Sequence, residues 1–205
     1  MRLLVIRHAE PELLSGACPD HERPLDATGR QQAARLADAL RGHTLDRVVS
    51  SNMRRAVETA APLADVFGVA LLSEPALAEI DMGRLAPWGP DEWKEWESVT
   101  ARWSAGDLAT PCPGGESLSD VVIRVEPALD RLLADPRWHG LAIVAHAVVN
   151  GVVLSLLCPE LRSKLGQNLG HSHAGVWELQ GEGRSFRVVR WNDVSHLRGG
   201  TDPEL

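Results

Sequence analysis

Two histidines in this chain of 205 residues stand directly after short apolar runs, with most of the chain between them. His8 follows Arg7 and the run LLVI at 3–6, and His146 follows the run LAIV at 141–144 and Ala145. An imidazole can act as a nucleophile, acid or base near neutral pH, and a neighbouring arginine supplies a permanent positive charge suited to phosphate. These residue types together predict a site for an anion.

The two apolar runs indicate how the histidines are positioned. Continuous, branched runs of this length are typical of central parallel strands that are covered on both faces by helices. In such sheets ligands bind outside the carboxyl ends of the strands. We therefore expect His8 and His146 to meet in one crevice, with Arg7 beside them.

A third segment adds positive charge to the same edge. A strand is expected at 47–51, and the helix expected at 54–67 carries Arg54 and Arg55 in its first turn. Free backbone N–H groups at the start of a helix already favour anions. From residue type alone, either arginine is a candidate phosphate ligand.

Strand and helix patterns alternate along the chain. Further helices are expected at 27–41, 117–134 and 148–157, and a short strand is expected at 69–72; Asp26 or Thr28 can cap the first helix, and Ser117-x-x-Asp120 opens the second as a capping box. The alternating runs at 175–180 and 185–191 predict a terminal hairpin. The pattern predicts an α/β fold, a three-layer α/β/α sandwich whose central sheet is mostly parallel with one antiparallel strand.

Residues 82–113 interrupt this alternation and contain four of the seven tryptophans. We interpret them as a small helical cap inserted in a single domain that spans 1–205, whose tail from 199 to 205 is expected to fray. Trp93, Trp96 and Trp103 share one helical face by their spacing, and Trp88 precedes them. They either attach the cap to the main domain or form a wall of the leaving-group pocket, which would favour an apolar or aromatic phosphate ester.

Six segments in order resemble the histidine phosphatase superfamily, also called the phosphoglycerate mutase-like family, over nearly the whole chain. They are LVIRHAE at 4–10, PLDATGRQQA at 24–33, SSNMRRAVETA at 50–60, LAEIDMG at 77–83, GGES at 114–117 and VAH at 144–146. The resemblance implies that His8 is a nucleophile that becomes transiently phosphorylated, that Arg7, Arg55 and His146 hold the phosphoryl oxygens, and that Glu79 is the proton donor. It also implies that neither a metal nor a cofactor is needed.

Some assignments depend on the family pattern. Arg55 is preferred over Arg54 because it fits Arg-Ala-x-x-Thr, and Glu79 is preferred over Asp81 because it fits Leu-x-Glu. The family often has glycine after each histidine, where this chain has Ala9 and Ala147. If either position needed a positive φ, the methyl group would cost about 1 kcal/mol.

The resemblance allows several activities. A cofactor-dependent phosphoglycerate mutase is disfavoured because the chain has no tyrosine, and because Pro11 and Leu14 replace polar residues of the family. Phosphohistidine-protein phosphatases of the family are typically shorter and lack a cap. The remaining prediction is a metal-independent phosphatase for small phosphomonoesters, similar to the broad-specificity and α-ribazole phosphatase group. The alternatives are mutase-type phosphotransfer and a non-catalytic phosphate-binding module.

Composition limits the partners. The net charge of −7 argues against nucleic-acid binding, and no apolar run approaches the length that spans a bilayer. The start of the chain has no signal-peptide pattern, which predicts a cytoplasmic protein. Three widely spaced cysteines suggest no disulfide, and the pair His171-x-His173 is not expected to bind a metal. A small phosphorylated metabolite is the expected partner; the sequence does not indicate an oligomeric state.

Overall fold

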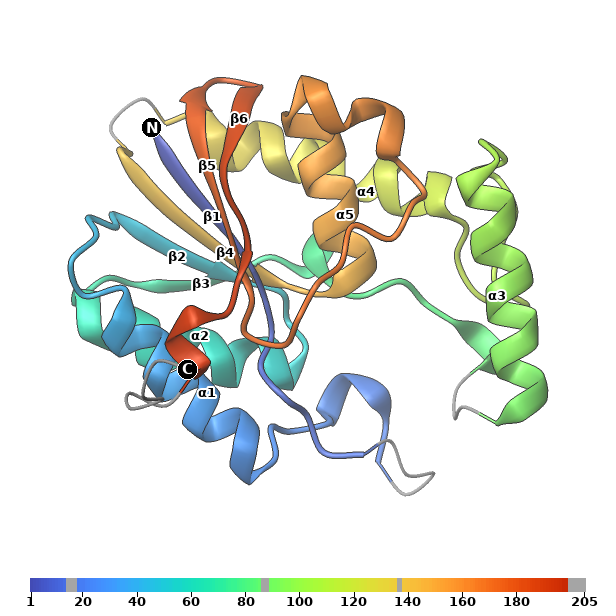
Figure 1. Cartoon of the computed structure of the whole chain (residues 1–205), viewed down its shortest axis with the longest axis horizontal. Coiled ribbons are helices and arrows are strands. Elements are labelled where there is room, and N and C mark those ends of the chain that lie inside the picture. Colours follow the sequence, from blue (N-terminus) through green and yellow to red (C-terminus); the bar gives the residue numbers. More distant parts are fainter. Residues whose placement is uncertain (14–17, 86–88, 136–137, 199–205) are drawn as a thin grey trace, which may run out of the picture.

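A computed structural model of the chain describes residues 1–13, 18–85, 89–135 and 138–198. Over these residues, the centre of the molecule is one six-stranded sheet with strand order β3-β2-β4-β1-β5-β6 (Figure 1). The strands are β1 Arg2–Arg7, β2 Arg47–Ser50, β3 Leu71–Ser73, β4 Gly140–Ala145, β5 Val176–Glu182 and β6 Ser185–Asp193. Strands β1 to β4 pair in parallel, and β5 pairs antiparallel with both β1 and β6. The predicted fold class and terminal hairpin are therefore confirmed.

Helices cover both faces of the sheet. The α-helices are α1 Ala27–Ala39, α2 Arg54–Phe67, α3 Pro90–Ser104, α4 Leu118–Leu133 and α5 Ala147–Leu157, of which α1 and α2 cover one face and α4 and α5 the other. In β1, Leu4 and Ile6 pack in the cluster formed with α1 and α2, whereas Leu3 and Val5 pack in the cluster formed with α4 and α5. Because successive side chains of a strand point to opposite faces, a run of four apolar residues serves both layers.

Local sequence signals fix the helix ends. The Asp26 carboxylate accepts a hydrogen bond from the Gly29 N–H and caps α1, and Ser117 with Asp120 forms the predicted capping box of α4. Several predicted bounds were wrong by one or two residues; the hairpin strands, expected at 175–180 and 185–191, end at Glu182 and Asp193. Helix α1 ends at Ala39 rather than at residue 41, and β3 is Leu71–Ser73 rather than 69–72, because the Val69 N–H still bonds to the Ala64 carbonyl at the end of α2.

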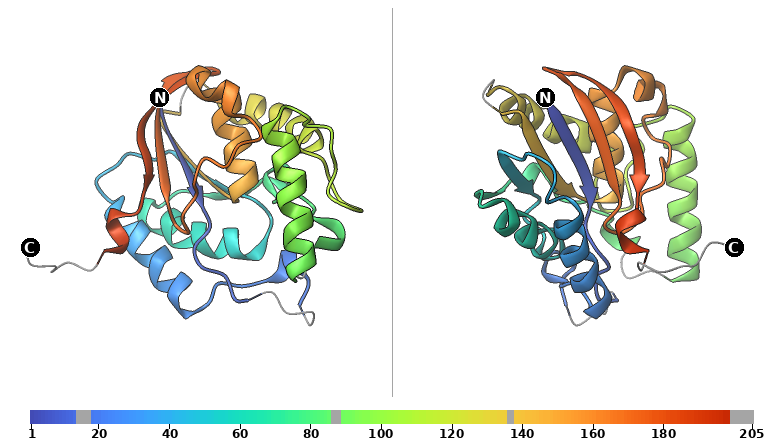
Figure 2. Two further views of the ribbon diagram at one scale, coloured as in Figure 1. Left: turned by 45° about the vertical axis from the view of Figure 1, so that its right-hand side comes forward. Right: turned by 60° about the vertical axis from the view of Figure 1, so that its left-hand side comes forward.

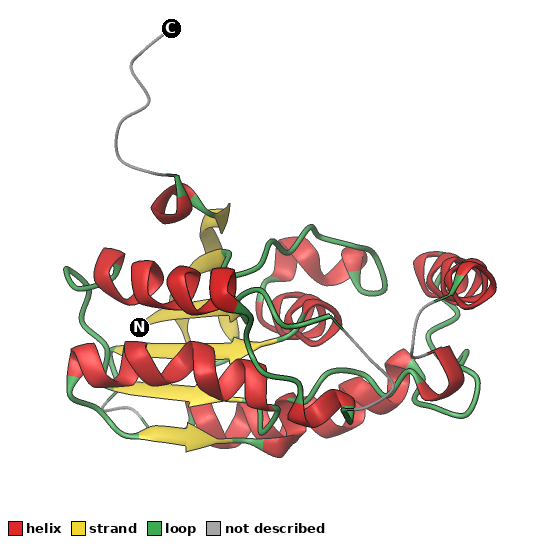
Figure 3. Ribbon diagram, turned by 90° about the horizontal axis from the view of Figure 1, so that it is seen from below, coloured by secondary structure: helices red, strands yellow, loops and turns green. Residues whose placement is uncertain are grey.

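Helix α3 lies at one end of the molecule, beyond α5, in each of the views of Figures 1 and 2. Figure 3, seen from below, shows α3 end-on and set apart from the layered main body. It lies within the predicted insertion at 82–113, so the helical part of that expectation is confirmed. Trp88 and the tail at 199–205 lie outside the described residues.

Two further properties concern the chain as a whole. None of the described helices is long and apolar enough to cross a membrane. Cys18, Cys112 and Cys158 are free thiols, as their spacing predicts.

Candidate active site

The carboxyl ends of the parallel strands bring the predicted residues to one edge of the sheet. His8 follows β1, Ser51 follows β2 and His146 follows β4. Strand β5 runs in the opposite direction, so the loop that precedes it, which contains His171 and His173, reaches the same edge. The ring centroids of His8 and His146 are 5.0 Å apart, so the two predicted histidines do meet.

A cleft of about 680 Å³ opens at this edge. Among the predicted residues, Arg7, His8, Arg55 and Glu79 line it. His146 is fully buried behind His8. The structure therefore brings together all five side chains that the sequence singled out, four at the surface of the cleft and one directly behind it.

The hydrogen bonds of His8 define its tautomer. Nδ1 lies 2.7 Å from the Ala9 carbonyl oxygen, which can only accept, so Nδ1 carries the proton. Nε2 lies 3.2 Å from Nε of Arg55, which can only donate, so Nε2 holds a lone pair. Burial, followed by the electrostatic interactions with the His146 ring and with the Arg55 guanidinium, holds the His8 pKa well below its usual range. His8 is thus neutral, with the free electron pair of Nε2 on the side of Arg55.

The His8 backbone is held on both sides. Its N–H donates to the Ala145 carbonyl at 2.9 Å, and its carbonyl accepts from the Ala174 N–H at 3.2 Å. The next N–H, of Ala9, donates to the Thr59 hydroxyl at 2.9 Å. The backbone of His8 and Ala9 is therefore hydrogen-bonded to β4, to α2 and to the loop before β5.

His146 has one partnered nitrogen. Ser51 Oγ lies 2.7 Å from Nε2, and the Met53 N–H donates to the same Oγ at 3.3 Å. Among the described residues Nδ1 has no hydrogen-bond partner although it is buried. Because burial and then Arg55 hold the His146 pKa well below its usual range, the ring is neutral. If Ser51 donates to Nε2, Nδ1 carries a proton that a phosphoryl oxygen can accept.

Arg54 and Arg55 separate as the family pattern predicts. Arg55 is 2 % exposed and its Nε contacts His8, whereas Arg54 is exposed and pairs with Glu58. The other two nitrogens of Arg55 donate to the carbonyl and carboxylate of Asp20. Asp20 lies in a short 3-10 helix, Asp20–Glu22, and its carboxylate occupies a position next to the guanidinium that a phosphate would also favour.

Other donors at the cleft lack a partner among the described residues. They are Nε of Arg7 and Nε of Arg23, both buried, which join Nδ1 of His146. Nη1 of Arg7 donates to the His171 carbonyl at 2.6 Å, which fixes the guanidinium. Buried donors without an acceptor are costly, and an anion such as a phosphoryl group supplies acceptors for them.

Glu79 and Asp81 also differ in their surroundings. Glu79 is partly buried, and its carboxyl oxygens accept from the Ile80 N–H at 3.1 Å and, more weakly, from Val148 and Val149 at the start of α5. Burial raises the Glu79 pKa, although the neighbouring Arg55 opposes this. Asp81 is exposed at the rim of the cleft and its Oδ1 accepts from the Gly83 N–H in a turn. The environment of Glu79 thus suits a group that must carry a proton.

The two alanines that replace glycine impose no backbone strain. The described non-glycine residues with positive φ are Ala174 and Asn192, so neither Ala9 nor Ala147 requires the left-handed conformation. Ala9 is buried, and Ala147 opens α5 at the wall of the cleft. The anticipated cost of a methyl group at these positions does not arise.

Of the other residues at the cleft, the sequence had suggested His173 and Arg23 as neighbours of the crevice without assigning either a catalytic role, whereas Asp20 was missed. His173 stands with its ring centroid 5.4 Å from that of His8, and its Nδ1 pairs with the Glu10 carboxylate. Asp20 and Arg23 line the cleft as well. The predicted hairpin was the signal that could have placed His171 and His173. If its first strand is paired antiparallel with β1, the loop before that strand reaches this edge of the sheet. Nothing local marked Asp20. Pro11 lines the cleft, and Leu14 lies outside the described residues.

The tryptophans of α3 take different positions. Trp103 is 2 % exposed, and its indole N–H donates to the Thr110 carbonyl at 2.8 Å. Trp96 packs edge-on against it at 5.5 Å between ring centroids and also lines the cleft. Trp93 is exposed. Trp103 therefore attaches the helix, and Trp96 is the tryptophan that reaches the cleft.

Comparison with known proteins agrees with this geometry. The family model described as histidine phosphatase superfamily (branch 1) matches residues 3–194. A curated relative, "Probable phosphoglycerate mutase GpmB" of Enterobacter sp. (strain 638), is 27% identical over 216 residues and covers 100% of this chain and 99% of its own length.

Solved structures share the fold. Mycobacterial glucosyl-3-phosphoglycerate phosphatase in complex with inorganic phosphate has a TM-score of 0.75 at 28% identity, covering 95% of this chain and 98% of its own. A putative α-ribazole-5'-P phosphatase from Escherichia coli K-12 has a TM-score of 0.75 at 22% identity, covering 94% of this chain and 96% of its own, which is a likeness of fold.

Proposed function

We propose that this chain, which belongs to the histidine phosphatase superfamily, branch 1, is a phosphatase that hydrolyses small phosphomonoesters without a metal ion, through a phosphohistidine on His8. The observation that carries the proposal is the state of His8. Its Nδ1 proton is bound by a carbonyl, and its Nε2 lone pair lies among arginine donors in a cleft. A neutral imidazole with a fixed lone pair is a nucleophile ready to attack phosphorus.

In the first step, Nε2 of His8 attacks the phosphorus of the ester and the bond from phosphorus to the ester oxygen breaks. Arg7, Arg55 and His146 donate hydrogen bonds to the phosphoryl oxygens, whose charge they offset without a metal ion. Glu79, whose raised pKa favours the protonated form, gives its proton to the departing oxygen and so releases a neutral alcohol.

In the second step, the Glu79 carboxylate takes a proton from a water molecule as the water attacks the phosphohistidine. The bond between phosphorus and Nε2 breaks, inorganic phosphate leaves, and both His8 and Glu79 return to their starting states. The same carboxyl group thus serves as acid and then as base, which requires a pKa that allows both forms.

Phosphoglycerate mutase remains the second candidate because relatives at about the same identity bear that name. A mutase must bind the carboxylate of its substrate and retain a bisphosphate between half-reactions. The chain has no tyrosine to match the family's mutase segment, which favours hydrolysis. The substrate we propose is a small phosphorylated metabolite.

The test is phosphate release from a panel of phosphomonoesters, with a chelator present throughout, by wild type and by His8→Ala. We expect chelator-resistant release that disappears in His8→Ala and persists in His139→Ala, a change at an exposed histidine away from the cleft. Release that persists in His8→Ala, or that the chelator abolishes, contradicts the mechanism.

The panel also separates the alternatives. Isomerisation of phosphoglycerate without net release would identify a mutase. Binding of vanadate or inorganic phosphate without turnover of any ester would identify a phosphate-binding module.

A further inference from the structure

A second cavity of about 540 Å³ lies between α3 and α5. We call it the α3–α5 groove; its walls include Trp93, Trp96 and Trp103 of α3, Gly151 of α5, and His171. The groove and the phosphate cleft share four lining residues, Arg7, Trp96, Ala147 and Val148. The two spaces are therefore adjacent, and a molecule whose phosphate contacts Arg7 can extend into the groove.

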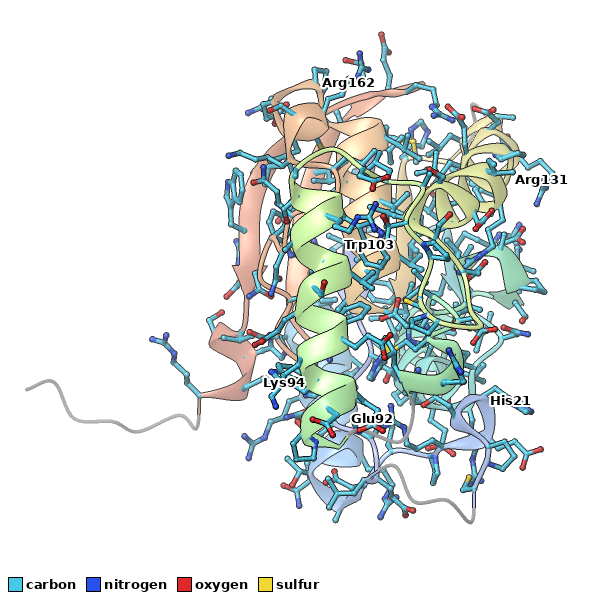
Figure 4. All side chains as sticks on the ribbon, turned by 90° about the vertical axis from the view of Figure 1, so that its right-hand side faces the viewer. His21, Glu92, Lys94, Trp103, Arg131 and Arg162 are labelled. Atoms are coloured by element: carbon cyan, nitrogen blue, oxygen red, sulfur yellow. The ribbon has the colours of Figure 1, made fainter. Side chains whose placement is uncertain are left out.

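The tryptophan wall is built in advance of any ligand. Trp103 is held by its hydrogen bond to the Thr110 carbonyl, and Trp96 packs edge-on against it. Figure 4, which views α3 from outside the molecule, labels Trp103 near the end of the helix opposite Glu92. Fixed indole rings present broad apolar surfaces, which bind planar rings with little loss of side-chain freedom.

His171 adds a polar group to this apolar space. Its ring packs against Trp177 at 5.4 Å between centroids, and both ring nitrogens are buried without a partner in the described part of the chain. Burial lowers the His171 pKa to about 4, so at neutral pH the ring holds one N–H donor and one lone pair. A hydroxyl or N–H group of a ligand can donate a hydrogen bond to the lone pair.

The charges of the groove select against an anion. Among the described residues its lining contains one cation, Arg7, whose Nη1 already binds the His171 carbonyl and which also lines the phosphate cleft. Glu97 stands in the lining with its carboxylate accepting from the Trp93 indole N–H at 3.0 Å. A second negative group on the ligand would meet this carboxylate without a compensating cation.

We propose that the α3–α5 groove binds the alcohol part of the phosphate ester, and that this part is an uncharged planar ring system that carries a hydroxyl or N–H group. The inference rests on the proposed phosphatase function and names its substrate class. It distinguishes ring-bearing esters from small acidic ones such as phosphoglycerate.

The test compares kcat/KM for four esters: adenosine 5'-monophosphate, 1-naphthyl phosphate, glycerol phosphate and 3-phosphoglycerate. We expect the two ring esters to exceed the other two by at least about tenfold, the factor that 1.4 kcal/mol of binding provides. Equal values for ring and acyclic esters would overturn the inference and leave the proposed function intact. No turnover of any ester would instead count against the proposed function.

A variant that fills the groove sharpens the test. A Cβ at Gly151 would have a single neighbour within 4 Å, Nε2 of His171 at 3.9 Å, so Gly151→Leu introduces its side chain into open space. We expect Gly151→Leu to reduce the preference for ring esters over glycerol phosphate by about tenfold, mainly through KM. The matched control is Gly42→Leu, where nothing lies within 4 Å and the site is distant, and it should keep the wild-type preference.

Binding of a ligand to the wild-type protein tests the inference without relying on turnover or on the folding of a variant. Adenosine, added to wild-type protein, should change tryptophan fluorescence with saturation, and His171→Leu should weaken adenosine binding more than the binding of naphthalene, which has no hydroxyl or N–H group. If adenosine does not bind and Gly151→Leu retains the full ring preference, the groove is not the leaving-group site.

Discussion

His8 is neutral because burial and nearby positive charges oppose its protonation. Its two partners then decide which nitrogen reacts: the Ala9 carbonyl retains the proton on Nδ1, and Arg55 faces the lone pair of Nε2. Arg55 has two roles in this mechanism. Its guanidinium orients the His8 ring, and we also assign to it hydrogen bonds to the phosphoryl oxygens. At this scale the chemistry depends on individual donor and acceptor atoms.

Replacing Arg55 should test that dependence. Arg55→Lys keeps the charge but removes the planar fork and the Nε contact to His8, and we expect kcat/KM to fall by about 10²–10³. Arg54→Lys is the matched control one residue away, and its effect should stay within about 0.5 kcal/mol because Arg54 is exposed. Steady-state kinetics on one ester measures both variants. Equal effects of the two changes would contradict the assignment.

Glu79→Gln should separate the two proton transfers. Gln cannot donate to the leaving oxygen, so kcat on alkyl esters should fall by about 10²–10³. A nitrophenyl ester needs little protonation, so it should phosphorylate His8 rapidly and give a burst of nitrophenol, because the second step then lacks its base. Stopped-flow absorbance measures the burst.

The pH profile gives a second readout of Glu79. Activity requires neutral His8, whose pKa is lowered, and protonated Glu79, whose pKa is raised, so kcat/KM should decline on the alkaline side as Glu79 loses its proton. The Glu79-dependent part of this decline should vanish in Glu79→Gln and persist in Asp81→Asn. An unchanged alkaline limb in Glu79→Gln would assign the acid elsewhere.

Most residues of the site were predictable because they sit at a strand or helix end that the sequence marks, whereas Glu79, in the loop after the 3-10 helix Pro75–Leu77, was chosen by the family pattern alone. His8, His146 and Arg55 were predicted on this basis, with the family pattern choosing between adjacent arginines. His173 was expected near the crevice without a catalytic role, and Asp20 was not predicted. Their positions depend on which strand neighbours β1 and on how the 3-10 helix Asp20–Glu22 folds over Arg55, and single-sequence patterns carry neither fact.

The elements around the site approach one another very closely where α1 meets the segment after His8. The Glu10 carbonyl accepts from the Asp26 N–H, and the Glu10 N–H donates to the Gln32 side chain. Gly29 permits this contact, because a Cβ there would lie 2.0 Å from the Glu10 oxygen. The glycine in the first turn of α1 therefore helps to position the segment that carries the nucleophile.

Gly29→Ala should disturb this junction. We expect the free energy of unfolding to fall by about 1–3 kcal/mol as the 9–11 segment shifts, with a parallel loss of kcat/KM. Gly42→Ala, with nothing within 4 Å of its Cβ, should change stability by no more than about 0.5 kcal/mol. Urea unfolding measures the free energy of unfolding of both variants. A Gly29→Ala protein as stable as wild type would show that the close approach of Gly29 to the Glu10 carbonyl is not needed for stability.

Element order and type were largely predictable, since strand runs and helix caps are local signals. The order of the strands in the sheet was not, because pairing depends on contacts between distant segments. The start of β3 was placed two residues early because Val69 completes the end of α2, a local competition that hydrophobic pattern alone does not resolve.

The whole molecule contains several buried histidines held neutral, and this links its stability to pH. His171 has a pKa near 4 when folded, lowered by burial, against about 6.5 in an unfolded chain. Between these two values the unfolded chain binds a proton that the folded protein does not. The contribution of neutral His171 to the free energy of unfolding is therefore complete above pH 6.5, and it is lost as the pH falls toward 4. His8 and His146 act in the same direction.

We expect the free energy of unfolding to decrease below pH 6.5, with His171 contributing about 1.4 kcal/mol per pH unit. His171→Gln should make the slope shallower by about that amount, whereas His139→Gln, a change at an exposed histidine, should keep the wild-type slope. Urea titrations from pH 7 to pH 4.5 measure the slopes. Identical slopes for wild type and His171→Gln would contradict the assignment of a buried neutral ring.

The central claim is that His8 carries the phosphoryl group during turnover. The most direct measurement mixes the enzyme with a nitrophenyl ester in the presence of a chelator, quenches in alkaline denaturant, and locates the phosphoryl group by mass spectrometry. We expect one phosphoryl group on His8 in wild type, more of it in Glu79→Gln, and none in His8→Asn, which should also lack turnover. Ester hydrolysis by His8→Asn, or a phosphoryl group on another residue, would contradict it.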